Sequence, residues 1–154
     1  MNWDQYFLNL TKAVSCKSAD PSTKVGCVIV GPDNEVRMTG FNGMPKGCKP
    51  DSDRFERPKK YQFFEHAERN ALYMAARRGI SVDGCTAYIS AHPCNECARG
   101  LIQAGIKRVV YPDVNPFEKR ADWRENLESA FLLLRECGVK VDAISIGDSL
   151  EYYL

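Results

Sequence analysis

The sequence predicts an α/β fold of three layers (α/β/α), in which a mixed five-stranded sheet is flanked by helices. Short apolar runs rich in β-branched residues alternate with longer amphipathic stretches. The first two runs lie close enough to pair as a hairpin, whereas later runs are separated by helices, which predicts parallel strands. The chain has 154 residues and no linker, repeat or low-complexity tract. We therefore expect one domain spanning residues 1–154.

The first 62 residues are predicted to form a helix, a hairpin and a long loop. Residues 2–15 carry apolar side chains three and four positions apart, which make one helix face: Trp3, Tyr6, Phe7, Leu10 and Val14. The apolar run 25–30 ends at a Gly-Pro-Asp-Asn turn, so residues 35–41 should return as its hairpin partner. Residues 42–62 have no strand or helix period. A loop of that length in a compact domain is usually functional or mobile.

Helices and strands alternate through the rest of the chain. Glycines that follow the helical patterns mark where the helices end. The predicted helices cover residues 66–78, a stretch opened by Pro93 and ended by Gly105, and 127–137. The predicted strands cover residues 85–90, 107–111 and 139–146.

Composition narrows the class of protein. Lys and Arg number 21 against 20 Asp and Glu, which gives a net charge of +1. Proteins that bind a nucleic-acid backbone usually carry a clear positive excess, so we expect no nucleic-acid partner, although a small anion needs only a few local cations. The N-terminus does not read as a secretion signal and no run approaches the length of a membrane span. Because the seven cysteines are odd in number, we expect no disulfide framework and a cytoplasmic location.

Two short motifs carry the chemistry, His66-Ala-Glu68 and Pro93-Cys94-Asn-Glu-Cys97. One imidazole and two thiolates are one ligand short of tetrahedral zinc, and catalytic zinc sites keep that fourth position for water. Both motifs fall at predicted helix N-termini, whose positive dipole ends favour thiolates. Together they match the zinc nucleobase deaminase signature, in which the glutamate is a general acid and base.

Other interpretations of the cysteines remain open at this stage. A closed structural zinc site would take a fourth ligand from Cys48, Cys85, Cys137 or His92, but it would leave Glu68 without a role. A redox role for Cys94 and Cys97 would make His66 and Glu68 coincidental. A third alternative is a catalytically inactive zinc- and nucleotide-binding module, which Glu68 also argues against.

The chain resembles the cytidine-deaminase superfamily and, within it, the deoxycytidylate (dCMP) deaminases. The resemblance covers most of the chain and lies in four segments: Asp20–Gly26, Gly40–Gly47, His66–Leu72 and Pro93–Cys97. The second segment, together with Asn70, points to the dCMP deaminases. The family fold is a five-stranded sheet flanked by helices, as the element order predicts.

The resemblance implies roles for individual residues. His66, Cys94 and Cys97 would hold one zinc ion per subunit, and Glu68 would move protons between water, ring N3 and the departing ammonia. Asn42 would hydrogen-bond the deoxyribose 3′-hydroxyl, and the backbone of Ala67, Ser90 and Ala91 would contact the pyrimidine edge. The resemblance further implies a homo-oligomer, with a hexamer favoured, and dCTP and dTTP effectors with Mg²⁺. Effector and interface candidates are Gly43, Lys46, Gly47 and Arg77.

The substrate phosphate requires cations, and the loops supply four candidates: Lys24, Lys46, Arg57 and Lys60. Each could equally be solvated surface. Tyr61, with Phe63 and Phe64, could wall the base pocket or simply pack in the core. The same chemistry on dCTP, a 5-modified dCMP, deoxycytidine or adenosine in tRNA remains the nearest rival, although the Asn42 segment favours a deoxynucleotide and the neutral charge speaks against tRNA.

Overall fold

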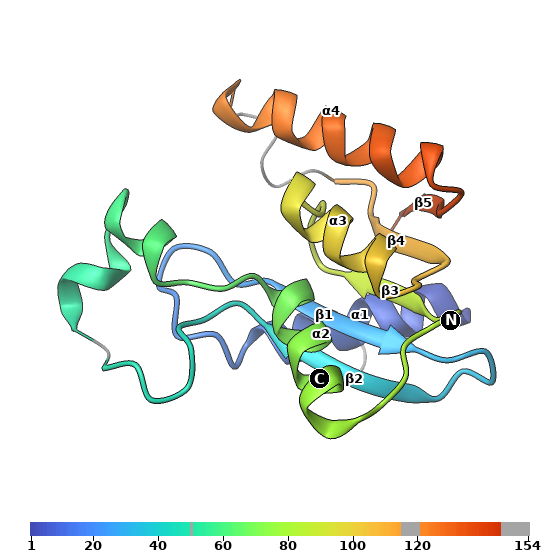
Figure 1. The fold of residues 1–154 in the computed structure, drawn as a ribbon, viewed down its shortest axis with the longest axis horizontal. Coiled ribbons are helices and arrows are strands. Elements are labelled where there is room, and N and C mark those ends of the chain that lie inside the picture. The colour runs from blue at the N-terminus through green and yellow to red at the C-terminus, as the bar shows by residue number, and fades with distance from the viewer. Residues whose placement is uncertain (50, 115–120, 146–154) are drawn as a thin grey trace.

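A computed structural model describes residues 1–49, 51–114 and 121–145 and shows a five-stranded sheet with helices on both faces (Figure 1). The strands lie in the order β2-β1-β3-β4-β5. β1 is antiparallel to β2 and β3, whereas β3, β4 and β5 run parallel. The predicted mixed sheet is therefore confirmed. The elements are α1 (Trp3–Ser15), β1 (Gly26–Val30), β2 (Val36–Phe41), η1 (Ser52–Phe55), η2 (Lys59–Gln62), α2 (Ala67–Arg78), β3 (Thr86–Ile89), α3 (Asn95–Gln103), β4 (Arg108–Pro112), α4 (Ala121–Glu136) and β5 (Lys140–Ile144).

The side chains of β1 alternate between two apolar cores. Cys27 and Ile29 face a core shared with α2, α3 and α4, whereas Val28 and Val30 face α1 through Phe7 and other residues. Successive residues of a strand point to opposite faces, and this strand is buried on both, so every residue is apolar or small. Figure 1 shows α2 and α3 in front of the sheet and α1 behind it.

Gly40 lets α2 lie directly on β2. A Cβ atom at Gly40 would lie 2.3 Å from the carbonyl oxygen of Ala67 and 2.5 Å from the backbone nitrogen of Ala71. Only glycine allows backbone to approach that closely. The contact fixes the position of the first turns of α2 against the sheet. Glu68, the glutamate of the first sequence motif, lies in the first of these turns.

The structure corrects three predicted boundaries. The helix predicted from residue 127 begins six residues earlier, at Ala121. The prediction missed these residues because the first turns of the helix are mostly exposed and have no apolar period. Pro93 precedes the third helix instead of opening it, and Cys94 is the N-cap residue. The last strand, predicted to reach residue 146, is β5; residue 146 itself lies outside the described residues.

Residues 42–62 form the predicted long loop, and the structure adds two short 3₁₀ helices, η1 and η2. In Figure 1 this segment extends to one side of the sheet before it returns to α2. Backbone bonds between Gly43 and Glu65, 3.0 and 2.9 Å long, close its two ends. Within the described part of the chain, the helices are too short or too polar to span a membrane.

Candidate active site

A pocket of about 330 Å³ lies between the first turns of α2 and α3, the loop that follows β2 and the beginning of α4. Residues of both sequence motifs line this pocket. The lining side chains include carboxylates, cations and aromatic rings from segments far apart in the sequence. They are Asp20, Thr23, Val25, Asn42, Arg57, Lys60, Tyr61, Phe64, Glu65, His66, Ala67, Glu68, Arg69, Ala91, His92, Cys94, Glu96, Trp123 and Asn126.

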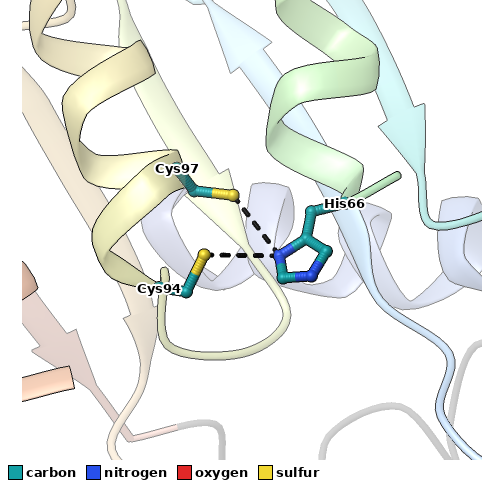
Figure 2. A group of neighbouring side chains, drawn as sticks. All are labelled: His66, Cys94 and Cys97. Atoms are coloured by element: carbon teal, nitrogen blue, oxygen red, sulfur yellow. Dashed lines mark hydrogen bonds between the residues drawn. The ribbon is translucent and has the colours of Figure 1, made fainter. Parts of the chain in front are cut away.

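The three predicted zinc ligands come from two helix N-termini that face one another. His66 is the N-cap of α2 and Cys94 is the N-cap of α3, both with extended backbone, and Cys97 lies one turn further on. Figure 2 shows the three side chains pointing toward a common centre. Cys94 and Cys97 are buried. The helix dipoles place positive partial charge where the thiolates lie, which favours the ligand-competent form of each sulfur.

The distances fit tetrahedral zinc. Nδ1 of His66 lies 3.4 Å from Sγ of Cys94 and 3.5 Å from Sγ of Cys97. With Zn–S near 2.3 Å and Zn–N near 2.0–2.1 Å, tetrahedral geometry requires a sulfur–nitrogen separation of about 3.6 Å. The geometry therefore identifies Nδ1 as the ligating nitrogen of His66.

The ligand set has three members among the described residues, His66, Cys94 and Cys97. His92, proposed as a fourth ligand of a closed site, packs instead against the Tyr111 ring at 4.3 Å between centroids. Cys48 contacts Arg54, and Cys137 is exposed. A zinc ion held by these three ligands would keep one position open, which is the arrangement of catalytic and not structural sites.

The two thiols share their protons unequally. A hydrogen bond with the Cys97 thiol lowers the pKa of Cys94, and His66 strengthens that effect. The same bond, together with burial, raises the pKa of Cys97. One thiolate therefore forms readily, and the second forms when a metal replaces the remaining proton.

Glu68 is buried beside the ligand set, with 3% of its surface exposed. Burial raises the pKa of its carboxyl group above the ordinary value. A carboxyl group with a raised pKa can both accept and donate a proton near neutral pH. Its place on the pocket wall, two residues after His66, matches the position that the sequence predicted for the proton carrier.

Another part of the pocket wall is built around a buried ion pair that the sequence did not reveal. Nζ of Lys60 lies 2.7 Å from Oδ2 of Asp20, and both side chains are almost fully buried. Lys60 also donates to Oγ of Ser22 at 2.9 Å. Burial on its own would raise the pKa of Asp20, but hydrogen bonds from Lys60 and Ser22 outweigh it and the pKa is lowered. Asp20 is therefore a charged anchor for this wall.

Asn42 is held in place by this wall. Its Oδ1 accepts from the backbone nitrogen of Val25 at 2.8 Å, and its Nδ2 donates to the carbonyl oxygen of Thr23 at 2.8 Å and to Asp20 at 3.4 Å. The amide orientation follows from these partners. One lone pair of Oδ1 is left for a ligand hydroxyl.

Residues 1–112 match the family model of the cytidine and deoxycytidylate deaminase zinc-binding region. That segment contains all three ligands and Glu68, and it is well over half of the chain. The chain belongs to this family.

Deoxycytidylate deaminases are among the relatives of this chain. The mouse protein is 37% identical over 145 residues, which are 90% of this chain and 78% of the mouse protein. The human protein is 38% identical over 117 residues, which are 72% of this chain and 65% of the human protein. The match therefore spans just under two thirds of the human sequence and more than three quarters of the mouse sequence.

Solved structures of the family share the fold. The dCMP deaminase of cyanophage S-TIM5, in complex with dCMP and dUMP, superposes with a TM-score of 0.72 at 27% identity, over 91% of this chain and 95% of that chain. The apo form of the same cyanophage protein gives the same TM-score at 26% identity.

The deaminase pocket gathers some of the other predicted site residues and leaves others outside. Ala67, Ala91 and Tyr61 line it, as do the phosphate candidates Arg57 and Lys60. Ser90 is not one of the lining residues, and its Oγ accepts from the backbone nitrogen of Gly26 at 2.9 Å. Four effector and cation candidates are exposed and do not line the pocket: Lys24, Lys46, Gly47 and Arg77. Gly43 pairs with Glu65.

Two pocket residues from α4 escaped the sequence analysis. The Trp123 ring stacks on His66, with 6.3 Å between ring centroids and 21° between planes. Oδ1 of Asn126 accepts from the backbone nitrogen of Asn95, in the first turn of α3, at 2.8 Å. Both residues precede the apolar period that starts at Leu127, so helix prediction from that period left them out. The residues before Leu127 carry no apolar period that could have predicted an earlier start for the helix.

Proposed function

We propose that this chain catalyses the zinc-dependent hydrolysis of dCMP to dUMP and ammonia. The observation that carries the proposal is the open set of three zinc ligands with buried Glu68 beside it, inside one pocket. Two findings support this substrate. The mouse and human relatives are named deoxycytidylate deaminases, and the cyanophage protein binds dCMP and dUMP. Oxygen from water replaces the amino group at C4, and ammonia leaves.

Glu68 has the proton-transfer role in this proposal. Zinc held by His66, Cys94 and Cys97 supplies Lewis-acid activation of a water molecule. Glu68 accepts one proton of that water and delivers it to ring N3. As the C4 carbonyl forms, Glu68 takes the second proton of the same oxygen and delivers it to the departing amino group, which leaves as ammonia. Its burial excludes competing water, and its raised pKa suits a group that works in both directions.

Asn42 is proposed to recognise the sugar. Because its amide is fixed by Val25, Thr23 and Asp20, its Oδ1 presents one lone pair in a set direction. The deoxyribose 3′-hydroxyl would donate to it. The backbone of Ala67 and Ala91, which lines the pocket, would contact the pyrimidine edge, with Ser90 supporting the strand end behind. Tyr61 would close the pocket beside the base.

Arg57 is the strongest phosphate candidate. It lines the pocket, and its Nη2 donates to Oγ1 of Thr23 at 3.4 Å. Because this bond is long, the guanidinium can turn to an anion. Lys60 already gives two of its three donors to Asp20 and Ser22.

An Arg57→Gln variant should raise KM for dCMP and leave KM for deoxycytidine unchanged. Exposed Lys24 provides the matched control, Lys24→Gln, in which KM for dCMP should stay near the wild-type value.

The function is tested by ammonia release from zinc-loaded protein, with dCMP, deoxycytidine, dCTP and CMP compared side by side. Preference for dCMP is the expected result. Preference for deoxycytidine or dCTP would keep the chemistry and contradict the substrate. Nucleotide binding without ammonia release from any of the four would support the inactive zinc- and nucleotide-binding module instead.

Assembly and regulation are proposed on the family resemblance. A homo-oligomer, with a hexamer favoured, is supported by the exposed side chains Tyr73 and Arg77 on the outer face of α2. Effector binding of dCTP or dTTP with Mg²⁺ would use Gly43, Lys46 and Gly47 at the start of the loop after β2. Light scattering at several protein concentrations tests the assembly, and dCMP saturation curves with added dCTP or dTTP test the effectors. The cytoplasm is the proposed compartment.

A further inference from the structure

Three charged side chains outside the ligand set join the first turn of α2 to the first turn of α3. The guanidinium of Arg69 forms an ion pair with the Glu65 carboxylate, just before α2. Its Nη1 also lies 2.7 Å from Oε2 of Glu96 in α3. Oε1 of Glu65 also accepts from the backbone nitrogen of His66 at 2.9 Å. Arg69 thus connects the residue that holds Nδ1 to the helix that holds both sulfurs.

Arg69, which belongs to α2, also packs closely against α3. Glu96 lies between Cys94 and Cys97 in the sequence, in the first turn of α3. The aliphatic stem of Arg69 passes over Gly100, where a Cβ atom would lie 4.0 Å from its Cγ. The side chain is 16% exposed, so most of it is shielded between the two helices. Its planar fork can bind two carboxylates at once, which a lysine cannot reproduce.

A zinc site split over two helices depends on the spacing between them. The sulfur–nitrogen separations of 3.4 and 3.5 Å join His66, at the start of α2, to ligands at the start of α3. A small shift of one helix against the other changes both separations together. When the three ligands come together without a metal, two sulfurs and the Glu68 carboxyl lie near one another. The positive charge of Arg69 lies close to both sulfurs.

We propose that Arg69 is a positioning residue for the zinc site. Through Glu65 and Glu96 it holds the first turns of α2 and α3 at ligating distance before the metal binds. The inference rests on the zinc role proposed above, but zinc binding is measured without substrate, so the two can fail separately. Partners that orient metal ligands typically change metal affinity by roughly 10–100-fold when removed.

The test is a zinc titration of metal-free protein against a chromophoric chelator. Arg69→Met should weaken zinc binding at least about tenfold. Glu96→Gln removes only the link between the helices, and because that carboxylate is 63% exposed, a smaller loss of about two- to threefold is expected. Arg78→Gln, in the last turn of α2, is the matched control and should bind zinc as wild type does.

Two further measurements separate positioning from general stability. The absorption spectrum of the cobalt-substituted protein reports ligand geometry, and it should change in Arg69→Met while the thermal midpoint of the metal-free protein stays within a few degrees of wild type. Arg69→Lys keeps the charge but not the fork, so it should restore only part of the zinc affinity.

Unchanged zinc affinity in both Arg69→Met and Glu96→Gln would overturn the inference. If Arg69→Met binds zinc normally but has a raised KM for dCMP, Arg69 is a phosphate contact and the positioning role is wrong. If wild type itself fails to bind zinc, the proposed function fails as well.

Discussion

The wall of the pocket that carries the zinc ligands is made from two helix N-termini, whereas a second part of the wall, around Asp20, Asn42 and Lys60, is made from loops. On the first wall, His66, Glu68 and the two cysteines take their positions from regular backbone and from the close contact of α2 with Gly40. On the second wall, Asn42 takes its position from side-chain hydrogen bonds around Asp20 and Lys60.

The difference shows which interactions each wall needs. Regular elements place side chains through backbone geometry, so the polar contacts of the first wall beyond its ligands lie where its two helices meet, at Glu65, Arg69 and Glu96. A loop has no repeating backbone pattern, and its polar groups must each find a partner when buried. The second wall therefore depends on one buried ion pair. We expect substitutions on the first wall to affect the reaction, and those on the second wall to affect stability and substrate affinity together.

The largest expected effect is on the first wall. Glu68→Gln keeps the shape of the side chain and removes its ability to accept a proton. The turnover number should fall roughly 10²–10⁴-fold, the usual range for loss of a general acid and base. Zinc content, measured by atomic absorption, should remain at one ion per subunit. Turnover within tenfold of wild type would remove Glu68 from the proton-transfer role.

The next effect breaks the anchor of the second wall. Asp20→Asn leaves the Lys60 ammonium buried without its charged partner, and losing one member of a buried pair costs about 3–5 kcal/mol. Urea unfolding should show this loss, and KM for dCMP should rise because Asn42 loses a support. In the double variant Asp20→Asn/Lys60→Met, which removes the unpaired charge, part of the stability should return. A loss below about 1 kcal/mol in the single variant would contradict the role of the pair.

A smaller effect is expected where the first wall meets the sheet. Gly40→Ala places a methyl group against the backbone of Ala67 and Ala71, which must move, and overpacking of this kind costs about 1–3 kcal/mol. The first turn of α2 would shift, so zinc affinity should fall with stability. Gly43→Ala is the matched control for unfolding, because its Cβ would meet only the ring of Phe41 at 3.9 Å. Equal stability of the two variants would mean that β2 and α2 can separate freely.

The smallest effect is that of mild acid on the second wall. Because the pKa of Asp20 is lowered in the folded protein, its contribution to stability is fully present above the ordinary value and is lost as the pH falls through the lowered value. Metal-free wild type and Asp20→Asn should therefore differ by a constant free energy of unfolding between pH 7 and about pH 5. The difference should shrink only in stronger acid. A difference that already narrows near pH 6 would show that another group is responsible.

The ligand spacing of the first wall could be predicted from the sequence. On the second wall the family resemblance indicated Asn42, but the ion pair that supports it could not be predicted. The spacing of Cys94 and Cys97, and of His66 and Glu68, is local, so helix geometry alone brings each pair together. Asp20 and Lys60 are 40 residues apart, and nothing in their neighbourhoods indicates that a lysine turns inward to meet a buried aspartate. Lys24 and Lys60 look alike in the sequence, yet one is exposed and the other is buried.

The sheet was predictable for the same reason. The apolar runs at β1, β3 and β4 are short, β-branched and flanked by turn residues, and the order of elements restricts how they can pair. The start of α4 was not predictable, because Trp123 and Asn126 face a pocket that polar and aromatic residues line together. A residue that lines a pocket contributes nothing to an apolar period.

Each metal-binding helix begins with a ligand in the position where a serine or aspartate usually stabilises the backbone. Among the described residues, neither His66 nor Cys94 caps its own helix with a side-chain hydrogen bond. A good capping residue contributes about 1 kcal/mol, so both helices give up local stability for chemistry. Selection for the stability of the metal-free chain would replace these two residues, whereas selection for zinc binding and activity retains them. A laboratory evolution of this chain for thermal resistance in the presence of a zinc chelator, with no test of turnover, should therefore accumulate Ser or Asp at these two positions.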